Sequence, residues 1–463
     1  MGDLAKIFKA YDIRGVVPDE LDPATAEAAG AAFVRVTGAS AIVTAHDMRE
    51  SSVPLAEAFA RGATSQGADV IEAGLGSTDM LYYASGSLDL PGAMFTASHN
   101  PARYNGLKLC RSGARPVGRD TGLAEIREMI EQGVPAYDGE PGTVSRRDIL
   151  KGYADHLKTL VDLSSIRPLK VVVDAGNGMG GHTVPSVFEG LPIELVPLYF
   201  ELDGTFPNHE ANPIEPENLR DLQAKVRETG ADIGLAFDGD ADRCFVVDER
   251  GEIVAPSAIT ALVATRELAK HPGSSIVHNL ITSRAVPEIV AEHGGTPVRT
   301  RVGHSFIKQT MAETGAVFGG EHSAHFYFRD FWFADSGMLA ALHVLAALGE
   351  QAEVVGRGRL VGEALPLSAL LREYTRYVAS GEINSEVADQ DAATTNVRAA
   401  FAGRPGTAID ELDGLTVSDD AAGWWFNLRP SNTEPLLRLN AEAGDDATMA
   451  AVRDEVLALV RKK

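Results

Sequence analysis

Apolar and polar residues follow one another along this chain in blocks whose lengths and spacing predict strands and helices in turn. Short apolar runs predict buried strands at residues 41–45, 70–73, 170–173, 193–198, 233–237, 275–280 and 297–300. Segments rich in helix-forming residues predict helices at residues 53–65, 257–270, 285–292, 338–348 and 448–461. Strands that alternate with helices in this way are typical of α/β units.

The pattern changes after Pro366, where strand-like segments dominate until the closing helix. Residues 374–386 and 415–428 each look like extended chain. A chain of 463 residues is too long for one hydrophobic core, so we expect several domains. The changes in pattern near Leu150, Gly251 and Leu367 predict four domains, at residues 1–150, 151–251, 252–367 and 368–463.

Composition and charge narrow the classes of partner. Hydrophobic residues make up 44% of the chain and charged residues 23%, as in globular proteins. The formal net charge of −23 argues against nucleic acid and anionic membranes as partners. Cys110 and Cys244 are too few for a disulfide framework, and no apolar run is long enough to span a bilayer. With no apolar signal core at the start of the sequence, we expect a cytoplasmic protein with reduced thiols.

Three aspartates, Asp238, Asp240 and Asp242, alternate with small residues between two apolar runs. In an extended segment their carboxylates would face one point, and such hard oxygen ligands suit Mg²⁺ or Ca²⁺ better than zinc. The competing interpretation is a solvated acidic turn. A calcium EF-hand is excluded, because Arg243 occupies the position where that motif requires glycine.

Two polar turns supply further groups for phosphate chemistry. The segment 96–101, Thr-Ala-Ser-His-Asn-Pro, places the Ser98 hydroxyl on a short turn that we expect to face solvent or a ligand. Arg429, Ser431, Asn432 and Thr433 gather a guanidinium, two hydroxyls and an amide, which suit a phosphate monoester. This second loop looks exposed, and a self-capped turn is the alternative. Together with the aspartates, these turns are the parts of a phosphoryl-transfer enzyme.

Three other features admit functional interpretations. Residues 176–181 match the pattern G-x-G-x-x-G after a predicted strand, with Glu194 or Glu201 downstream, so a dinucleotide site is one alternative. In the loop 321–325, Glu321 and Ser323 offer hydrogen bonds for vicinal sugar hydroxyls, and His325 is a candidate for proton transfer. Lys108 is a candidate phosphate contact or acid/base group. Each of these features also occurs as ordinary turn or surface structure.

The chain resembles the α-D-phosphohexomutases, most closely their bacterial phosphomannomutase/phosphoglucomutase branch. The resemblance runs in order through residues 8–15, 96–101, 238–243, 320–325 and 429–435, and covers the whole length. It implies three α/β domains of similar topology and a C-terminal α+β domain around a central cleft.

The resemblance also implies a role for each matching residue. Ser98 would be the phosphoserine, and Asp238, Asp240 and Asp242 would hold Mg²⁺ together with an oxygen of that phosphate. The remaining implied site residues are Arg14, His99, Lys108 and Arg243 around the phosphoserine; Glu321, Ser323 and His325 at the sugar; Arg429, Ser431, Asn432 and Thr433 at the second phosphate; and Tyr11 and His304 as minor cleft residues.

The implied reaction interconverts hexose 1-phosphate and hexose 6-phosphate through glucose 1,6-bisphosphate or mannose 1,6-bisphosphate, in a monomer or a homodimer. His322 is a departure, because dual-specificity members commonly carry methionine and phosphoglucosamine mutases glutamine at this place. A phosphoglucosamine mutase is therefore an alternative. Alternatives from other classes are a metal-dependent phosphatase with Asp238 as nucleophile, a nicotinamide-dependent oxidoreductase, and a sugar-phosphate sensor without activity.

Overall fold

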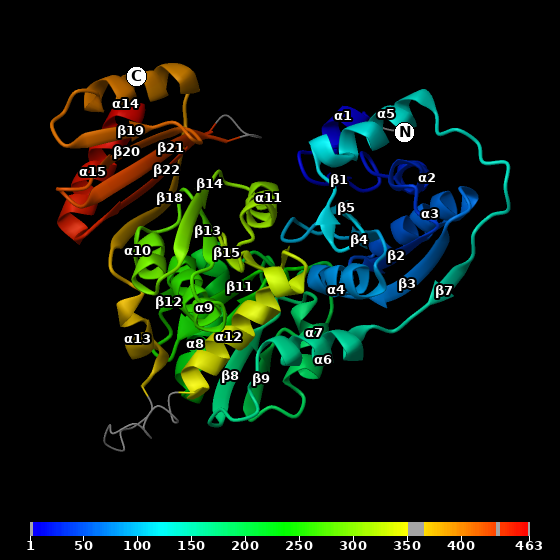
Figure 1. The fold of residues 1–463 in the computed structure, drawn as a ribbon, viewed down its shortest axis with the longest axis horizontal. Coiled ribbons are helices and arrows are strands. Elements are labelled where there is room, and N and C mark those ends of the chain that lie inside the picture. The colour runs from blue at the N-terminus through cyan, green and yellow to red at the C-terminus, as the bar shows by residue number, and fades with distance from the viewer. Residues whose placement is uncertain (1–2, 351–364, 432–435, 462–463) are drawn as a thin grey trace. The chain divides into compact units, whose positions relative to one another are not determined.

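The computed structural model describes residues 3–350, 365–431 and 436–461 (Figure 1). These residues divide into two compact units. The first unit contains the chain up to Ile259 together with Ser323–Leu370, and the second contains Thr260–His322 together with the chain from Leu371 onwards. Each unit is built from sheets with helices packed against them.

The first unit begins with a seven-stranded mixed sheet. Its strand order is β1-β5-β4-β2-β3-β7, with β6 paired to β5. The strands are β1 (Ile13–Val16), β2 (Ala41–His46), β3 (Asp69–Leu75), β4 (Gly92–Phe95), β5 (Tyr104–Arg111), β6 (Arg115–Pro116) and β7 (Val144–Arg146). The strands β3 and β4 flank β2 in parallel, whereas β5 runs antiparallel to β4 and β1. The chain therefore leaves β4 and returns into β5 through one short loop, residues 96–103.

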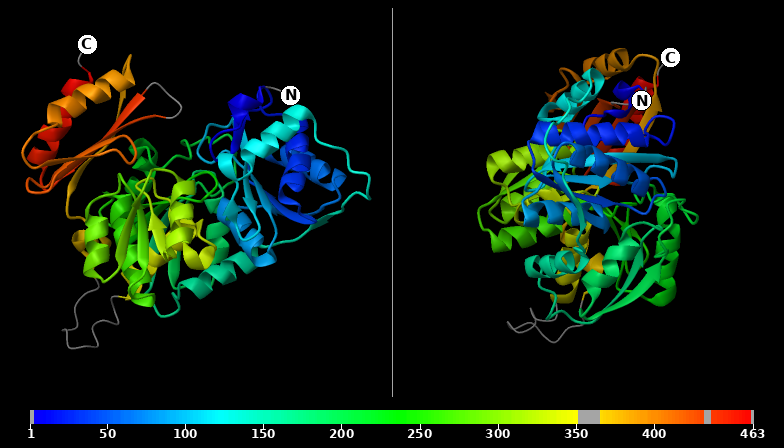
Figure 2. Two further views of the ribbon diagram at one scale, coloured as in Figure 1. Left: turned by 45° about the horizontal axis from the view of Figure 1, so that its top comes forward. Right: turned by 90° about the vertical axis from the view of Figure 1, so that its right-hand side faces the viewer.

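Helices bury the apolar residues of this sheet. They are α1 (Leu4–Ile7), α2 (Pro23–Thr37), α3 (Ser52–Ser65), α4 (Thr78–Leu88) and α5 (Leu123–Gln132), with the 3₁₀ helix η1 (Arg119–Thr121). Phe33, Phe59 and Phe95 belong to the core, where the Phe59 ring contacts the rings of the other two. Residues 133–143, which are mostly exposed, run outside the sheet between α5 and β7 (Figure 2).

A five-stranded sheet follows in the order β12-β11-β10-β8-β9. Its strands are β8 (Leu169–Asp174), β9 (Ile193–Leu198), β10 (Ile233–Phe237), β11 (Cys244–Asp248) and β12 (Ile253–Val254). Its helices are α6 (Leu150–Leu160), α7 (Gly180–Phe188), η2 (Pro216–Leu219) and α8 (Arg220–Thr229). The strand β10 lies parallel to β8 and antiparallel to β11, so residues 238–243 form the tight turn of a hairpin.

The third segment contributes to both units. The elements from residue 256 to 320 are α9 (Pro256–Lys270), β13 (Ser275–Asn279), α10 (Ala285–Glu292), β14 (Thr296–Thr300), α11 (His304–Thr314) and β15 (Phe318–Gly320). The strands β14 and β15 pair in parallel with β13. In the first unit, β16 (Phe326–Phe328) and β17 (Ala334–Asp335) form an antiparallel pair. They are accompanied by η3 (Arg329–Phe331), α12 (Gly337–Gly349) and α13 (Leu367–Leu370).

The chain ends in an antiparallel sheet with the order β18-β22-β21-β20-β19. Its strands are β18 (Val378–Glu386), β19 (Thr407–Asp410), β20 (Leu415–Asp419), β21 (Trp424–Pro430) and β22 (Leu436–Ala443). The helices α14 (Gln390–Phe401) and α15 (Asp446–Val460) pack against it, after the short η6 (Leu371–Glu373). Phe401, Phe426 and Val456 lie in its core.

The predicted strands and helices are confirmed, with differences in the C-terminal sheet. The segment 415–428 is a hairpin rather than one strand, because Asp419 accepts a hydrogen bond from the backbone of Ala422, and Gly423 adopts a positive φ of 70°. The strand expected from residue 374 begins only at Val378. None of the described helices combines the length and hydrophobicity that crossing a bilayer requires.

Candidate active site

The three aspartates lie in the turn between β10 and β11. The backbone N–H of Ala241 donates to the carbonyl of Asp238, and Ala241 has a positive φ of 58°. This turn brings one carboxylate oxygen from each of Asp238, Asp240 and Asp242 within 4.8 Å of the others. The convergence predicted from the sequence is present, but its cause is a hairpin turn and not the side alternation of an extended strand.

These carboxylates are fully buried, and two cations face them. The Arg243 guanidinium donates to Asp238 from Nε and Nη2, each at 3.0 Å. The Lys108 ammonium donates to Asp240 at 2.7 Å and to Asp242 at 2.6 Å. Three negative charges are thus opposed by two positive charges. One negative charge is left uncompensated, which favours the binding of a further cation.

The pKa values in the cluster move in opposite directions. Burial raises the pKa of the Asp238 carboxyl to about 7, because the Arg243 guanidinium offsets only part of the desolvation penalty. Burial acts on Asp240 as well, but the Lys108 ammonium and the hydrogen bonds around this carboxylate outweigh it and hold its pKa below the usual value. Asp240 is therefore the more firmly ionised of these two carboxylates.

The donor set fits a divalent cation. Oδ1 of Asp240 and Oδ1 of Asp242 are buried and accept no hydrogen bond from any residue that the structure describes. Buried carboxylate oxygens without a donor are unfavourable unless a cation contacts them. Oxygen ligands alone favour Mg²⁺ or Ca²⁺ over softer metals.

Ser98 joins this cluster from the loop between β4 and β5. Its hydroxyl donates to Oδ2 of Asp238 at 2.7 Å and lies 3.2 Å from Nδ1 of His99. The Ser98 side chain was expected to face solvent or a ligand, but only 5% of the residue is exposed, since it lies against the aspartate turn. Ser98 also adopts a positive φ of 51°, which is uncommon for a residue with a side chain.

The other residues assigned to the phosphoserine surroundings lie in the same region. Arg14 donates from Nη1 to the Asn100 side chain at 2.5 Å and also pairs with Asp12. Burial, together with the charges of Arg243 and Arg14, holds the pKa of His99 well below its usual value. His99 is therefore neutral near pH 7 and can accept a hydrogen bond through one ring nitrogen.

The glycine-rich turn of residues 176–181 packs against the aspartate turn. A side chain at Gly178 would place its Cβ 2.7 Å from the carbonyl oxygen of Gly239, and one at Gly239 would lie 2.4 Å from the carbonyl oxygen of Ser98. At Gly181 a Cβ would lie 2.3 Å from the carbonyl oxygen of Phe200, and Gly176 has a positive φ of 52°, so these glycines are explained without a nucleotide. The match to G-x-G-x-x-G is therefore accounted for by packing.

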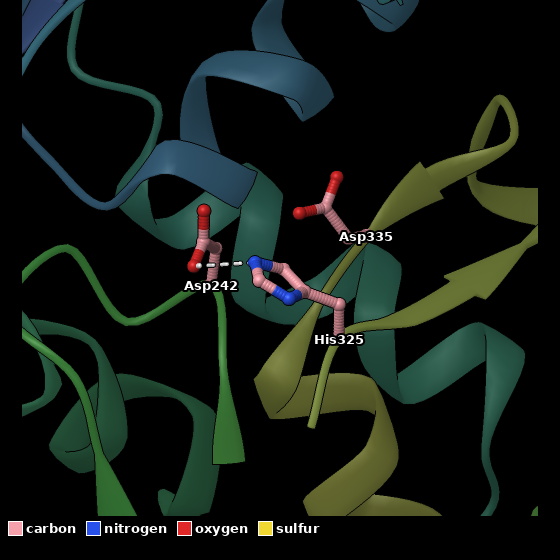
Figure 3. A group of neighbouring side chains, drawn as sticks. All are labelled: Asp242, His325 and Asp335. Carbon is pink, nitrogen blue, oxygen red and sulfur yellow. Dashed lines mark ion pairs between the residues drawn. The ribbon is translucent and has the colours of Figure 1, made fainter. Parts of the chain in front are cut away.

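The loop that contains Glu321 and His325 is divided between the two units. In the second unit, the buried Glu321 accepts a hydrogen bond of 3.2 Å from Nδ2 of Asn279. In the first unit, His325 lies before β16 with Nε2 3.8 Å from Oδ1 of Asp242, and Nδ1 lies 3.1 Å from the Ser323 hydroxyl (Figure 3). His325 is thus directed at the aspartate cluster.

Arg429 differs from the exposure expected for the C-terminal loop. Arg429 lies at the end of β21 with 8% of its surface exposed, and its guanidinium faces Glu382 at 3.4 Å. Arg438 contacts the same glutamate at 3.5 Å and donates to the Ser431 hydroxyl at 3.3 Å. The strand β21, which carries Arg429, lies between β20 and β22, and Glu382 on β18 faces the guanidinium. Asn432 and Thr433 lie outside the described residues.

Tyr11 and His304, the two expected minor cleft residues, belong to different units. Tyr11 is half-buried just before β1 in the first unit, and His304 is half-buried at the first position of α11 in the second.

Sequence reasoning missed three residues near the cluster. Thr78 donates its hydroxyl to Oδ2 of Asp240 at 2.6 Å, and Asp335 on β17 lies beside Asp242 and His325 (Figure 3). Arg49 donates to the backbone of the Ser98 loop. A polar N-cap directly after a strand, Ser77-Thr78, was the one available signal, since helix starts at the ends of strands often line sites.

Four family models match successive parts of the chain. Models of the family described as phosphoglucomutase/phosphomannomutase match residues 5–135 (alpha/beta/alpha domain I), 151–251 (alpha/beta/alpha domain II), 255–363 (alpha/beta/alpha domain III) and 382–459 (C-terminal domain). These matches confirm the predicted architecture of three α/β domains and a further C-terminal domain.

Individual relatives match over nearly their full length. A phosphomannomutase of Salmonella montevideo is 41% identical, over 98% of this chain and 98% of its own. A protein of Xanthomonas campestris named "Phosphohexose mutases" is 43% identical over 97% of each chain. The crystal structure of a phosphoglucomutase/phosphomannomutase family protein from Burkholderia thailandensis superimposes with a TM-score of 0.86 at 33% identity, covering 100% of this chain and 99% of that one. The chain belongs to the phosphoglucomutase/phosphomannomutase family.

Proposed function

We propose that this protein interconverts hexose 1-phosphates and hexose 6-phosphates by reversible phosphoryl transfer through Ser98. The observation that carries the proposal is the hydrogen bond from the Ser98 hydroxyl to Asp238, inside a cluster of three buried carboxylates and two cations. Relatives at 41% and 43% identity are named phosphomannomutase and phosphohexose mutase, which supports the same reaction class here. The protein is then an isomerase of carbohydrate metabolism.

The phosphoryl group moves between two oxygens. In the first half-reaction, a sugar hydroxyl forms a bond to phosphorus as the bond between phosphorus and the Ser98 oxygen breaks. The product is a sugar 1,6-bisphosphate, glucose 1,6-bisphosphate or mannose 1,6-bisphosphate. After this intermediate turns end for end, its other phosphate returns to Ser98 and the isomeric monophosphate leaves.

Charge near Ser98 stabilises this transfer. Mg²⁺ held by Asp238, Asp240, Asp242 and an oxygen of the serine phosphate would offset charge on the transferred group. Arg243 and Lys108 add two fixed positive charges within the same cluster. Because these groups are already oriented and largely buried, little reorganisation is needed when charge develops.

Proton transfer requires groups close to the reacting oxygens. The attacking sugar hydroxyl loses a proton, and the serine oxygen gains one when phosphate leaves it. We assign these roles to Lys108, His99 and His325, which lie around the cluster. Arg14 would stabilise the phosphate charge from the edge of the Ser98 loop.

Substrate recognition is assigned to the other two polar loops. Glu321 and Ser323 would bind the sugar hydroxyls. Arg429, Ser431, Asn432 and Thr433 would hold the phosphate that is not reacting, with Tyr11 and His304 as further contacts. A separate phosphate site suits a substrate that must bind in two orientations. The burial of Arg429 against Glu382 supports a fixed, preorganised guanidinium.

The proposal also covers the domain boundaries and the cellular setting of the protein. We propose that the four domains extend over residues 1–150, 151–251, 252–367 and 368–463, which the separate family matches support. We also propose that the protein acts in the cytoplasm on small sugar phosphates, as a monomer or a homodimer, without nucleic acid or membrane partners.

Relative activity on three sugars tests the proposed substrate. kcat/KM should be measured with mannose 1-phosphate, glucose 1-phosphate and glucosamine 1-phosphate, in the presence of Mg²⁺ and a trace of sugar 1,6-bisphosphate. Comparable values for mannose and glucose support a site that tolerates both orientations of the C2 hydroxyl. A preference of ~10⁴ or more for glucosamine 1-phosphate would indicate a dedicated contact at C2 and a phosphoglucosamine mutase.

A further inference from the structure

Arg49 is a buried arginine that the reaction scheme above does not use. It lies between β2 and α3, with 1% of its side chain exposed. A guanidinium has five N–H donors in one plane, and burial without partners would be strongly unfavourable. The acceptors that these five N–H groups bind therefore indicate what the side chain does.

Four of the five donors of Arg49 bind backbone carbonyls, three in the loop that carries Ser98 and one at Tyr104, where β5 begins. Nη2 donates to the carbonyls of Ser98 at 2.8 Å and Asn100 at 2.7 Å. Nη1 donates to the carbonyls of Pro101 at 2.9 Å and Tyr104 at 3.0 Å. One planar group thus binds carbonyls spread over seven residues, from 98 to 104, and directs them to a common centre.

The fifth donor fixes Arg49 to the sheet. Nε donates to Oδ2 of Asp47 at 3.2 Å, and the other oxygen of Asp47 accepts from the Ser52 hydroxyl at 2.6 Å. The backbone N–H of Asp47 donates to the carbonyl of Phe95, the last residue of β4. Ser52 also accepts a hydrogen bond of 2.9 Å from Asn105 on β5. Arg49 is therefore anchored to the two strands between which the loop runs.

A ring covers the guanidinium as well. The Phe206 ring lies 5.1 Å from the guanidinium carbon, at the distance of a cation–π contact. With five donors used and an aromatic ring nearby, the side chain has no N–H left for a sugar phosphate. Arg49 therefore does not act by contact with substrate.

The loop needs such support because its backbone is not in a relaxed conformation. Ser98 has a positive φ of 51°, which non-glycine residues adopt only where their surroundings impose it. Its hydroxyl must also stay within hydrogen-bond reach of Asp238, on a different sheet. A displacement of about 1 Å in such an arrangement is enough to slow a reaction by ~10²-fold.

We propose that Arg49 is a positioning residue for phosphoryl transfer, which holds the Ser98 loop in the conformation that presents the serine oxygen to the carboxylate cluster. The inference rests on the proposed function of Ser98. It assigns a role to a residue that the sequence motifs do not single out. Arg49 neither transfers a proton nor contacts the substrate.

The test compares Arg49→Lys with a control of similar stability. Lysine keeps the charge beside Asp47 but has three donors around one nitrogen, so it cannot span the four carbonyls. The control is Ile126→Ala, a truncation in the core of the same domain on α5. Folded fractions are measured by circular dichroism, and all rates are expressed per folded molecule.

The expected result is a fall in kcat of ~10²-fold for Arg49→Lys, with KM for glucose 1-phosphate changed less than about threefold. Single-turnover labelling of Ser98 from ³²P-labelled glucose 1,6-bisphosphate should slow by the same factor. Ile126→Ala should keep kcat within about twofold of the unmodified protein. A purely structural role would leave both variants with unchanged kcat per folded molecule, and that result would overturn the inference.

A milder variant keeps the inference testable if Arg49→Lys does not fold. Ser52→Ala removes one hydrogen bond to Asp47 and leaves the guanidinium in place. A fall in kcat of about threefold to tenfold at constant KM supports the positioning role, and an unchanged kcat contradicts it. If the unmodified protein takes no label on Ser98, the proposed function itself fails. If the unmodified protein is labelled and Arg49→Lys and Ser52→Ala are labelled at the same rate, only the inference about Arg49 fails.

Discussion

The hydroxyl of Thr78 donates a hydrogen bond of 2.6 Å to Oδ2 of Asp240, and the backbone N–H of Thr78 donates to the carbonyl of the same residue at 3.0 Å. Thr78 is the first residue of α4, 162 positions before Asp240. The start of this helix therefore orients a carboxylate of the candidate metal site from outside the metal-binding turn.

Replacement of Thr78 by valine removes this hydroxyl with little change in shape. Because partners that orient metal ligands contribute to affinity, we expect Thr78→Val to weaken Mg²⁺ binding by ~10-fold or more. Isothermal titration with Mg²⁺ measures the change directly. Thr25→Val on α2 is the matched control, since Thr25 is a buried threonine outside the aspartate cluster. Equal Mg²⁺ affinities in the two variants would show that Thr78 does not orient the site.

Asp240→Asn changes one of the proposed metal ligands. The variant keeps the shape of the side chain but removes one of three negative charges, while Lys108 retains Asp242 as a partner. We expect Mg²⁺ affinity and kcat to fall by ~10²-fold or more, with the folded structure retained. Titration calorimetry measures the Mg²⁺ affinity, and circular dichroism shows whether the variant is still folded. The exposed Asp391→Asn on α14 serves as control, and full activity in Asp240→Asn would refute the metal assignment.

Asp79 gives the fold a dependence on pH. Its buried carboxylate accepts hydrogen bonds of 2.7 Å from Tyr153 on α6 and from Ser336 at the start of α12. Burial raises its pKa from 3.8 to about 6, although these hydroxyls and Ser77 favour the ionised form. The folded state therefore binds a proton more tightly than the unfolded state.

The sign of the effect follows from this difference in pKa. The contribution of Asp79 to the free energy of unfolding is fully present below pH 3.8 and is lost as the pH rises through about 6, a change of about 3 kcal/mol. Asp79→Asn lacks this pH-dependent contribution. From pH 4 to pH 7 its free energy of unfolding should therefore rise by about 3 kcal/mol relative to that of the unmodified protein. Urea unfolding at several pH values measures it. A difference that stays constant with pH would contradict the raised pKa.

The sequence predicted those site residues that are close together along the chain. Asp238, Asp240 and Asp242 lie within five consecutive positions, so their convergence required only a local turn. The predicted strand 233–237 has the bounds of β10 because its apolar residues are buried on both faces. Local patterns carry this kind of information.

Residues that act across the fold were not predictable in the same way. Arg49 and Thr78 look like ordinary residues of a loop and a helix start, and their partners lie 49 and 162 positions away. The burial of Arg429 was missed because a guanidinium, a proline and a serine in succession read as an exposed turn, whereas neighbouring strands cover it. The strand-like segment 415–428 was not divided into its two strands, although Asp419, Asp420 and Gly423 are typical of the turn between them.

Phosphorylation of Ser98 is the step on which the whole account depends. The protein should be mixed with ³²P-labelled glucose 1,6-bisphosphate and Mg²⁺, digested and mapped, beside the variant Ser98→Ala. We expect acid-stable label on Ser98 that passes to glucose 1-phosphate when this sugar is added, and a loss of turnover of ~10³-fold or more in Ser98→Ala. Acid-labile label on Asp238, or full turnover in Ser98→Ala, would contradict the account and favour an aspartate-dependent phosphatase.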